Sequence, residues 1–138
     1  MEELINQTVQ ARTSASKTKD AIMASSEQLI ALGIDLDDTL DRFGGNAEFL
    51  EKMLHLFVQG DTVDRMVEAF TAQNADALER TSHAIKGSAA NLGFTELSSR
   101  ASDVCEFVRA THTAEVPQDM IDYVVEGYKR ICDGVAAL

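Results

Sequence analysis

The sequence has little of several residue types that other classes of protein need. Its 138 residues include one proline and no tryptophan, and aromatic residues make up 6% of the chain. Aromatic and β-branched residues, which favour β-strands, do not cluster. No apolar run approaches the roughly 18 residues of a membrane-spanning helix, and the N-terminal stretch lacks the pattern of a secretory signal. We therefore expect an all-α, cytoplasmic protein without a membrane partner.

Cysteine is equally scarce. Cys105 and Cys132 are too few for a disulfide framework, and their spacing does not suggest zinc. Both fall at apolar positions of expected helices, where a reduced thiol acts as a small hydrophobic side chain. We interpret them as buried reduced thiols, with a disulfide between them as the alternative, and expect no metal site.

Positive charge is in short supply. Twelve Lys and Arg residues stand against 23 Asp and Glu residues, so the net charge is −11. A chain of this charge would repel nucleic-acid phosphates, which argues against a nucleic-acid partner. The hydrophobic content of 45% and the length suit one globular domain.

The apolar residues that are present recur at helical spacing in four long segments. A short helix is expected first, over 35–43, with Asp35 or Asp37 as its cap and Gly44-Gly45 as its end. The long segments are 46–70, which could bend near Gly60-Asp61, then 74–93, 95–108 and 117–135. Four amphipathic helices with short connections predict an antiparallel up-down four-helix bundle over residues 34–138.

Residues 1–33 precede this bundle. Their apolar residues are grouped at both ends, and the middle lacks an apolar side. We expect a helical or partly ordered extension that contributes one or two additional N-terminal helices. A dimerising or docking helix, or part of a linker, are the alternatives that the sequence leaves open.

The segment 76–93 carries the residues with the most chemical promise. Its apolar stripe repeats at steps of four and three through Leu78, Ser82, Ile85, Ala89 and Leu92. By helical geometry, His83 points about 140° away from Leu78, onto the polar side. Lys86 and Gly87 follow His83 by three and four residues, so both are its neighbours on the helix surface. The helix therefore offers an imidazole with an ammonium group and a bare backbone patch beside it.

Gly87 is an unexpected choice for a helix interior. Glycine there costs about 1 kcal/mol relative to alanine. The plausible gain is clearance, because no side chain at position 87 covers the His83 ring or blocks the surface of a partner.

These residues resemble a known signature. The run His83-Ala84-Ile85-Lys86-Gly87-Ser88-Ala89, followed by Asn91-Leu92-Gly93, is similar to that of histidine-containing phosphotransfer (HPt) domains, H-x-[hydrophobic]-K-G-[small]-[small]-x-x-[hydrophobic]-G. The similarity extends over about 34–138 and includes Asp35, the turn 42–45, Phe57 and Asp76. The resemblance implies the same helical bundle.

The resemblance also implies a function. HPt domains accept a phosphoryl group on the histidine from an aspartyl phosphate of one receiver domain and pass it to the aspartate of another. Mg²⁺ and the catalytic carboxylates belong to the receiver, so we expect no cofactor on this chain. The expected partners are receiver domains of response regulators or hybrid histidine kinases, and we expect a monomer.

Each candidate residue has an expected role. His83 is the phosphoacceptor, Lys86 stabilises charge on the phosphoryl oxygens, and Gly87 gives clearance. The candidates for partner binding, chosen by helical position alone, are Glu79, Arg80, Ala90 and Asn91. The other two histidines, His55 and His112, lack such neighbours and are interpreted as structural or incidental.

Two rival functions stay open. A histidine kinase would need a nucleotide-binding domain with glycine-rich loops, and the sequence contains no such segment. A receiver-binding adaptor of the same fold would need no phosphorylation. The presence of both His83 and Lys86 favours the phosphorelay over the adaptor.

Overall fold

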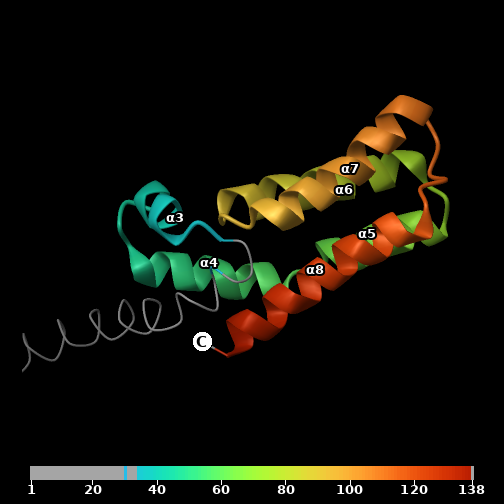
Figure 1. Cartoon of the computed structure of the whole chain (residues 1–138). Helices are drawn as coiled ribbons and strands as arrows, with labels where there is room; N and C mark the ends of the chain where they lie inside the picture. The colour runs from blue at the N-terminus through green and yellow to red at the C-terminus, as the bar shows by residue number, and fades with distance from the viewer. Residues whose placement is uncertain (1–29, 31–33, 138) are drawn as a thin grey trace, which may run out of the picture.

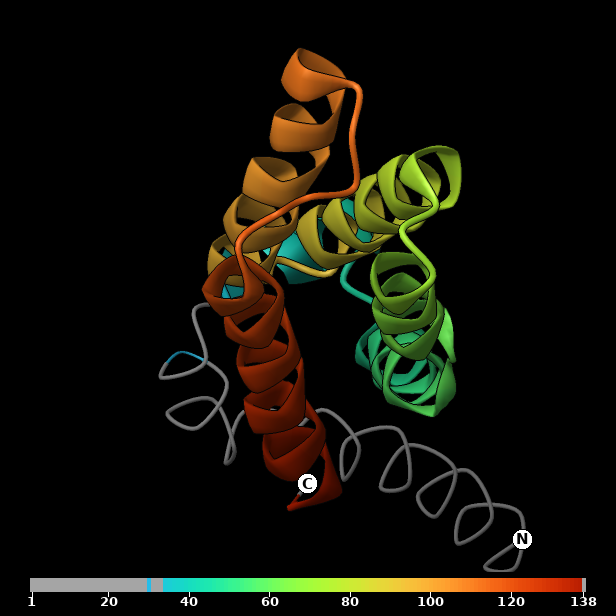
Figure 2. The same cartoon turned by 90° about the vertical axis from the view of Figure 1, so that its right-hand side faces the viewer.

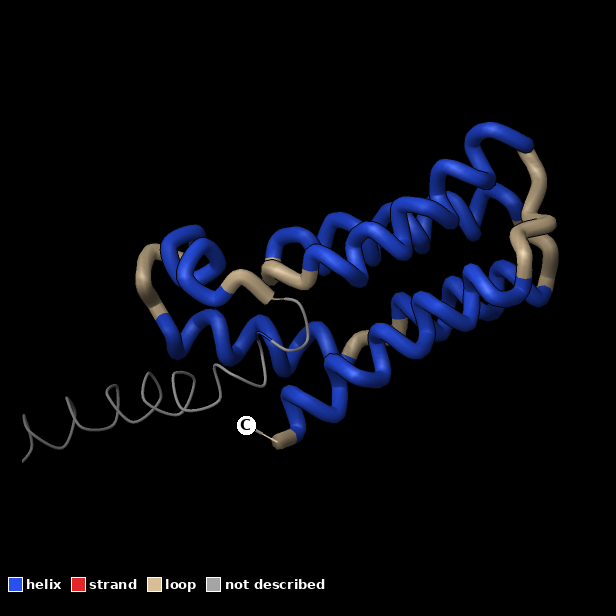
Figure 3. Tube along the Cα trace, in the orientation of Figure 1, coloured by secondary structure: helices blue, strands red, loops and turns tan. Residues whose placement is uncertain are grey.

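The computed structural model describes Ile30 and residues 34–137, and every regular element in that part of the chain is an α-helix (Figure 3). The predictions for residues 1–33 lie outside the described residues, apart from Ile30. A single antiparallel bridge pairs Ile34 with Phe94. The helices are α3 (Leu36–Arg42), α4 (Ala47–Gln59), α5 (Thr62–Thr71), α6 (Ala75–Asn91), α7 (Thr95–Thr111) and α8 (Gln118–Ala136).

The predicted antiparallel four-helix bundle is confirmed. The broken helix α4–α5 forms its first member, and α6, α7 and α8 follow with alternating direction (Figure 1). Helix α6 packs against α5 and α7, and α8 packs against α7, α4 and α5, so the four members close into a ring. Figure 2 shows α7 above α8 and α6 meeting α5 on the other side. Both long sides of α6 are therefore flanked by other helices.

The expected helix over 46–70 is not continuous. It breaks at Gly60, whose backbone is extended with φ −72° and ψ 164°. The Tyr128 hydroxyl of α8 donates to the carbonyl oxygens of Phe57 at 2.9 Å and Val58 at 3.1 Å. Carbonyl groups at a helix end lack partners within the helix, so the phenol satisfies acceptors that the break exposes. The possible bend near Gly60-Asp61 is thus a complete interruption.

The helix ends follow predicted caps. Asp35, Asn46 and Asn74 each accept a hydrogen bond from the backbone N–H three residues later, which satisfies donors at the starts of α3, α4 and α6. Gly93 follows α6 with φ +86°, a conformation that glycine adopts without strain. Pro117 was expected in the first turn of the last helix, but it lies one residue before α8.

The core contains the predicted stripe of α6, and all five of its members are buried. Phe49, an apolar residue of the expected helix over 46–70, is 45% exposed; it lies in the first turn of α4 and packs edge-on against Phe43. Cys105 is buried as predicted, whereas Cys132 is only partly buried; both are free thiols, so the alternative of a disulfide between them is wrong. No helix of the described part combines the length and hydropathy needed to cross a membrane.

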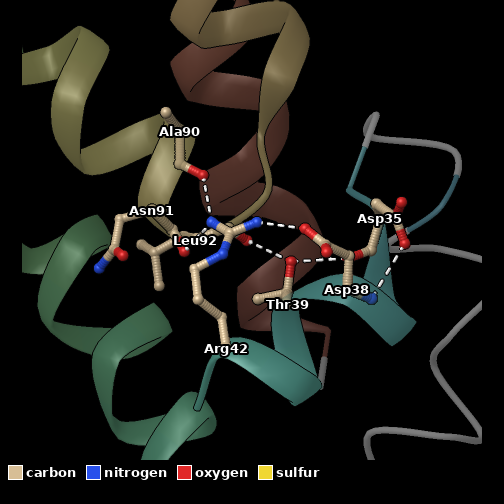
Figure 4. A network of polar contacts seen from close by, with 7 residues as sticks. All are labelled: Asp35, Asp38, Thr39, Arg42, Ala90, Asn91 and Leu92. Atoms are coloured by element: carbon tan, nitrogen blue, oxygen red, sulfur yellow. Dashed lines mark hydrogen bonds and ion pairs between the residues drawn. The ribbon is translucent and has the colours of Figure 1, made fainter.

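Helix α3 forms hydrogen bonds with the backbone where α6 ends and the turn to α7 begins (Figure 4). Arg42 Nη1 donates to the carbonyl oxygens of Ala90 at 2.7 Å and Asn91 at 2.9 Å, and its other terminal nitrogen pairs with Asp38. The Thr39 hydroxyl lies 3.5 Å from the Leu92 carbonyl oxygen. The guanidinium therefore caps the C-terminal end of α6, the same helix that carries His83.

Candidate functional site

His83 is exposed on α6, as the helical count predicts. The preceding residue, Ser82, is fully buried, and its hydroxyl donates back to the Leu78 carbonyl oxygen at 2.7 Å. Ile85, two residues after His83, is also buried. Since buried residues on this helix fix its rotation against the bundle, they direct the imidazole toward solvent.

Lys86 and Gly87 stand beside this histidine on the same helix surface. Lys86 is half-buried, and its backbone carbonyl accepts a 2.9 Å hydrogen bond from the Ser98 hydroxyl of α7. Gly87 is exposed, and a Cβ placed on it would meet nothing within 4 Å. The protein itself therefore does not require glycine at position 87 for packing.

On the α5 side, α6 borders two hollows. The first has a volume of about 260 Å³ and lies where α4 ends; Leu56, Ile85, Ser88 and Asn91 contribute to its lining. Leu56 is 51% exposed although it is apolar. The second hollow lies between α5 and α6, where Arg65 and Arg80 border a floor of small residues, Ala69, Ala72, Ala77 and Ala84. This side of the helix combines apolar surface with charges of both signs, because Glu68 also lines the second hollow and Arg65 pairs with Asp61 at 3.1 Å.

On the α7 side, Glu79 forms an ion pair between helices. Its Oε1 accepts a hydrogen bond from Arg109 Nε at 2.8 Å. This hydrogen bond is the main cause that raises the pKa of Arg109 above its ordinary value. The two side chains are 37% and 51% exposed, so solvent screens the pair and it contributes little to folding.

The four predicted partner-binding residues are not equally available to a partner. Arg80, Ala90 and Asn91 are exposed, whereas the carboxylate of Glu79 is already held by Arg109. His55 lies on α4 with Nε2 3.8 Å from Glu51, and His112 ends α7 in a left-handed conformation. Among residues 30 and 34–137, no group of three or more His, Cys, Asp or Glu side chains could hold a metal ion.

Reasoning from the sequence missed the contributions of α7 and α3 to this site. Arg109 follows buried Cys105 by four residues, so its side of the helix could have been recognised as the one that faces α6. The hydrogen bond from Ser98 to Lys86 joins residues that are 12 positions apart, and the one from Arg42 to Ala90 joins residues that are 48 positions apart. No local sequence pattern indicates such pairs.

Comparisons with known proteins agree with this architecture. The model of the Hpt domain family matches residues 47–137. The crystal structure of the HPT domain from an Hpt sensor hybrid histidine kinase from Shewanella has a TM-score of 0.67 to this chain and is 13% identical; the alignment covers 77% of this chain and 92% of that one. Curated proteins give no significant match. Because the family model covers well over half of the sequence, the chain belongs to the Hpt domain family.

Proposed function

We propose that this chain is a phosphorelay intermediate, which accepts a phosphoryl group on His83 from a receiver aspartyl phosphate and passes it to another receiver aspartate. Hpt domains are phosphotransfer modules of two-component signalling rather than kinases, and membership of the family supports that general role. The observation that carries the assignment to His83 is its exposure on α6 next to half-buried Lys86 and uncovered Gly87.

The chemical step needs little from this chain beyond placement. A neutral imidazole has one unprotonated ring nitrogen, and the lone pair of that nitrogen attacks phosphorus. The N–P bond forms while the P–O bond to the aspartyl carboxylate breaks, and the carboxylate leaves with the electron pair. Negative charge spreads over three phosphoryl oxygens in the transition state, where Lys86 supplies an ammonium group. Mg²⁺ would be supplied by the receiver.

A receiver would approach over the exposed ridge of α6. The two hollows on the α5 side give it apolar surface and the arginines Arg65 and Arg80, beside the outward face of Ala90 and Asn91. An acidic phosphorylation site on the receiver would complement the guanidinium of Arg80, although Arg65 pairs with Asp61 and the chain as a whole carries −11.

Transfer from a phosphorylated receiver tests the proposal. Purified receiver domains are labelled on their aspartate, mixed with this protein, and the label is followed over time. We expect acid-labile label on the wild type and none on His83→Gln. Lys86→Ala should slow transfer by roughly fivefold, about 1 kcal/mol, because an exposed charge contact contributes modestly. Label that still attaches to the His83→Gln protein would show that another residue is the acceptor.

The same assay separates the rival functions. Self-labelling that requires ATP would identify a kinase. Binding to a receiver without any label on His83 would identify an adaptor. Transfer without added ATP supports the relay.

A further inference from the structure

The ion pair between Glu79 and Arg109 lies one helical turn from His83. We propose that Arg109 is a positioning residue for phosphotransfer: it holds the Glu79 carboxylate against α7 and so keeps negative charge away from the imidazole. This inference rests on the function proposed above, because it concerns the reactivity of the same histidine.

The spacing brings Glu79 within reach of His83. The two residues are four positions apart on α6, where Cβ atoms lie roughly 5–6 Å from each other. A glutamate side chain at this spacing can turn either toward the histidine or away from it. In this protein it turns to α7, where Arg109 Nε lies 2.8 Å from its Oε1.

Helix α7 fastens α6 on both sides of the histidine. The Cys105 thiol lies 3.9 Å from the Glu79 carbonyl oxygen, and the Ser98 hydroxyl bonds the Lys86 carbonyl oxygen at 2.9 Å. These two contacts fix the backbone four residues before and three residues after His83. Arg109 adds a contact to the acidic side chain itself, at 2.8 Å, so its effect is on charge rather than on the fold.

The charge balance explains why this matters. A phosphoryl group adds about −1.5 to −2 charges near pH 7. Glu79 is the acidic residue nearest to His83 along α6, while Arg80 and Lys86 are positive. A free carboxylate at position 79 would repel the incoming phosphoryl group. It would also accept a hydrogen bond from the N–H of the His83 ring. When Glu79 is paired with Arg109, its charge is balanced, while Arg80 and Lys86 remain positive on the same helix.

Phosphoramidate is a suitable probe because it is small and requires no receiver. In the reaction, a His83 ring nitrogen forms the N–P bond, the P–N bond of phosphoramidate breaks, and ammonia leaves. Initial rates are measured for the full-length wild type, Arg109→Gln, Glu79→Gln and the double variant. Arg130→Gln, which removes an exposed arginine of α8, is the matched control for net charge.

We expect Arg109→Gln to label roughly two- to fivefold more slowly, the scale of a partly exposed charge interaction. Glu79→Gln should restore the wild-type rate in the Arg109→Gln background, because the repelling carboxylate is then gone. Arg109→Lys should keep most of the rate, and Arg130→Gln should keep all of it. The defect should shrink as salt rises.

Two results would overturn the inference. One is an Arg109→Gln rate equal to wild type at low salt. The other is a double variant as slow as Arg109→Gln, which would mean that Arg109 acts on the phosphoryl group directly. Circular dichroism confirms that each variant is folded, and Arg109→Met, which also removes the positive charge, replaces Arg109→Gln in the cycle if the latter is not. A wild type that takes no label on His83 from a phosphorylated receiver would instead refute the proposed function itself.

Discussion

At position 87, folding and the proposed phosphotransfer favour different residues. Its backbone lies in a regular helix, it is absent from the residues with positive φ, and open space surrounds the place of a Cβ. Alanine would therefore fit and would favour the helix. Packing inside this chain does not require glycine here; on the proposed function, glycine gives clearance for a partner at His83.

This reading predicts opposite effects on stability and transfer. Gly87→Ala should raise the free energy of unfolding by up to about 1 kcal/mol, since the position is an exposed helix interior. Gly87→Leu should keep the helical circular-dichroism signal but cripple phosphoryl transfer from a receiver, because its side chain covers the approach to the imidazole. Urea unfolding and transfer rates measure the two properties. A Gly87→Leu protein that transfers at the wild-type rate would contradict the clearance argument.

At the scale of elements, α3 lies outside the match to the family model yet contacts the helix that carries His83. It anchors the end of α6 through the Arg42 guanidinium, which takes two carbonyl groups that the helix cannot pair internally. The buried contact of Thr39 with Leu92 adds to this anchor. Helix α3 is thus joined by hydrogen bonds to the C-terminal end of α6.

Loss of this anchor has a measurable cost. Arg42→Ala should lower the free energy of unfolding by about 1 kcal/mol, because two charge-assisted hydrogen bonds are lost at a partly exposed site. Amide exchange in residues 92–94 should accelerate. Asp38→Asn removes the carboxylate partner of Arg42 but leaves the carbonyl contacts, so its effect should be smaller. Equal effects of the two variants would show that the ion pair, not the cap, holds α3 in place.

At the scale of the molecule, α8 carries two partly buried ionisable groups, Tyr128 at the break in the first helix and Cys132 one turn further along. Burial is the main cause that raises the pKa of the Tyr128 phenol and of the Cys132 thiol above their ordinary values. In the unfolded chain these groups ionise near pH 10 and 8.5, about their ordinary pKa values. In the folded chain they keep their protons to higher pH.

Stability should therefore fall in alkaline solution. Between about pH 8.5 and 11 the folded state binds more protons than the unfolded state, so the free energy of unfolding decreases as pH rises. Below about pH 8 this contribution is fully present. Urea unfolding at a series of pH values measures the slope, which Tyr128→Phe should flatten. Tyr123, on the same helix but 50% exposed, provides the control: Tyr123→Phe should leave the slope steep.

The parts of this molecule that could be predicted are those encoded within a few neighbouring residues. The apolar stripe of α6 can be recognised from helical spacing alone, and Asn46 and Asn74 cap the helices that directly follow them. The exposure of His83 follows from its angular position on the helix relative to that stripe. These signals were enough for the bundle and for the face that carries the candidate site.

The parts that could not be predicted depend on contacts between distant segments. Arg100 illustrates this: it is buried, its Nη1 donates to the Tyr123 carbonyl oxygen at 2.9 Å, and Gly127 leaves room for it. No pattern around position 100 distinguishes this arginine from a solvated one. The same holds for the pairing of Arg109 with Glu79, since the relative rotation of two packed helices is set by the whole core.

The exposure of His83 affects how long a phosphoryl group can remain on it. Bulk water reaches the ring as freely as a receiver does, and the described part of the chain covers neither it nor the neighbouring Gly87. On the proposed function, phosphorus stored there is steadily lost to hydrolysis. The phosphorylated chain would then have a limited lifetime, and an accepting receiver would have to take the phosphoryl group before it is hydrolysed.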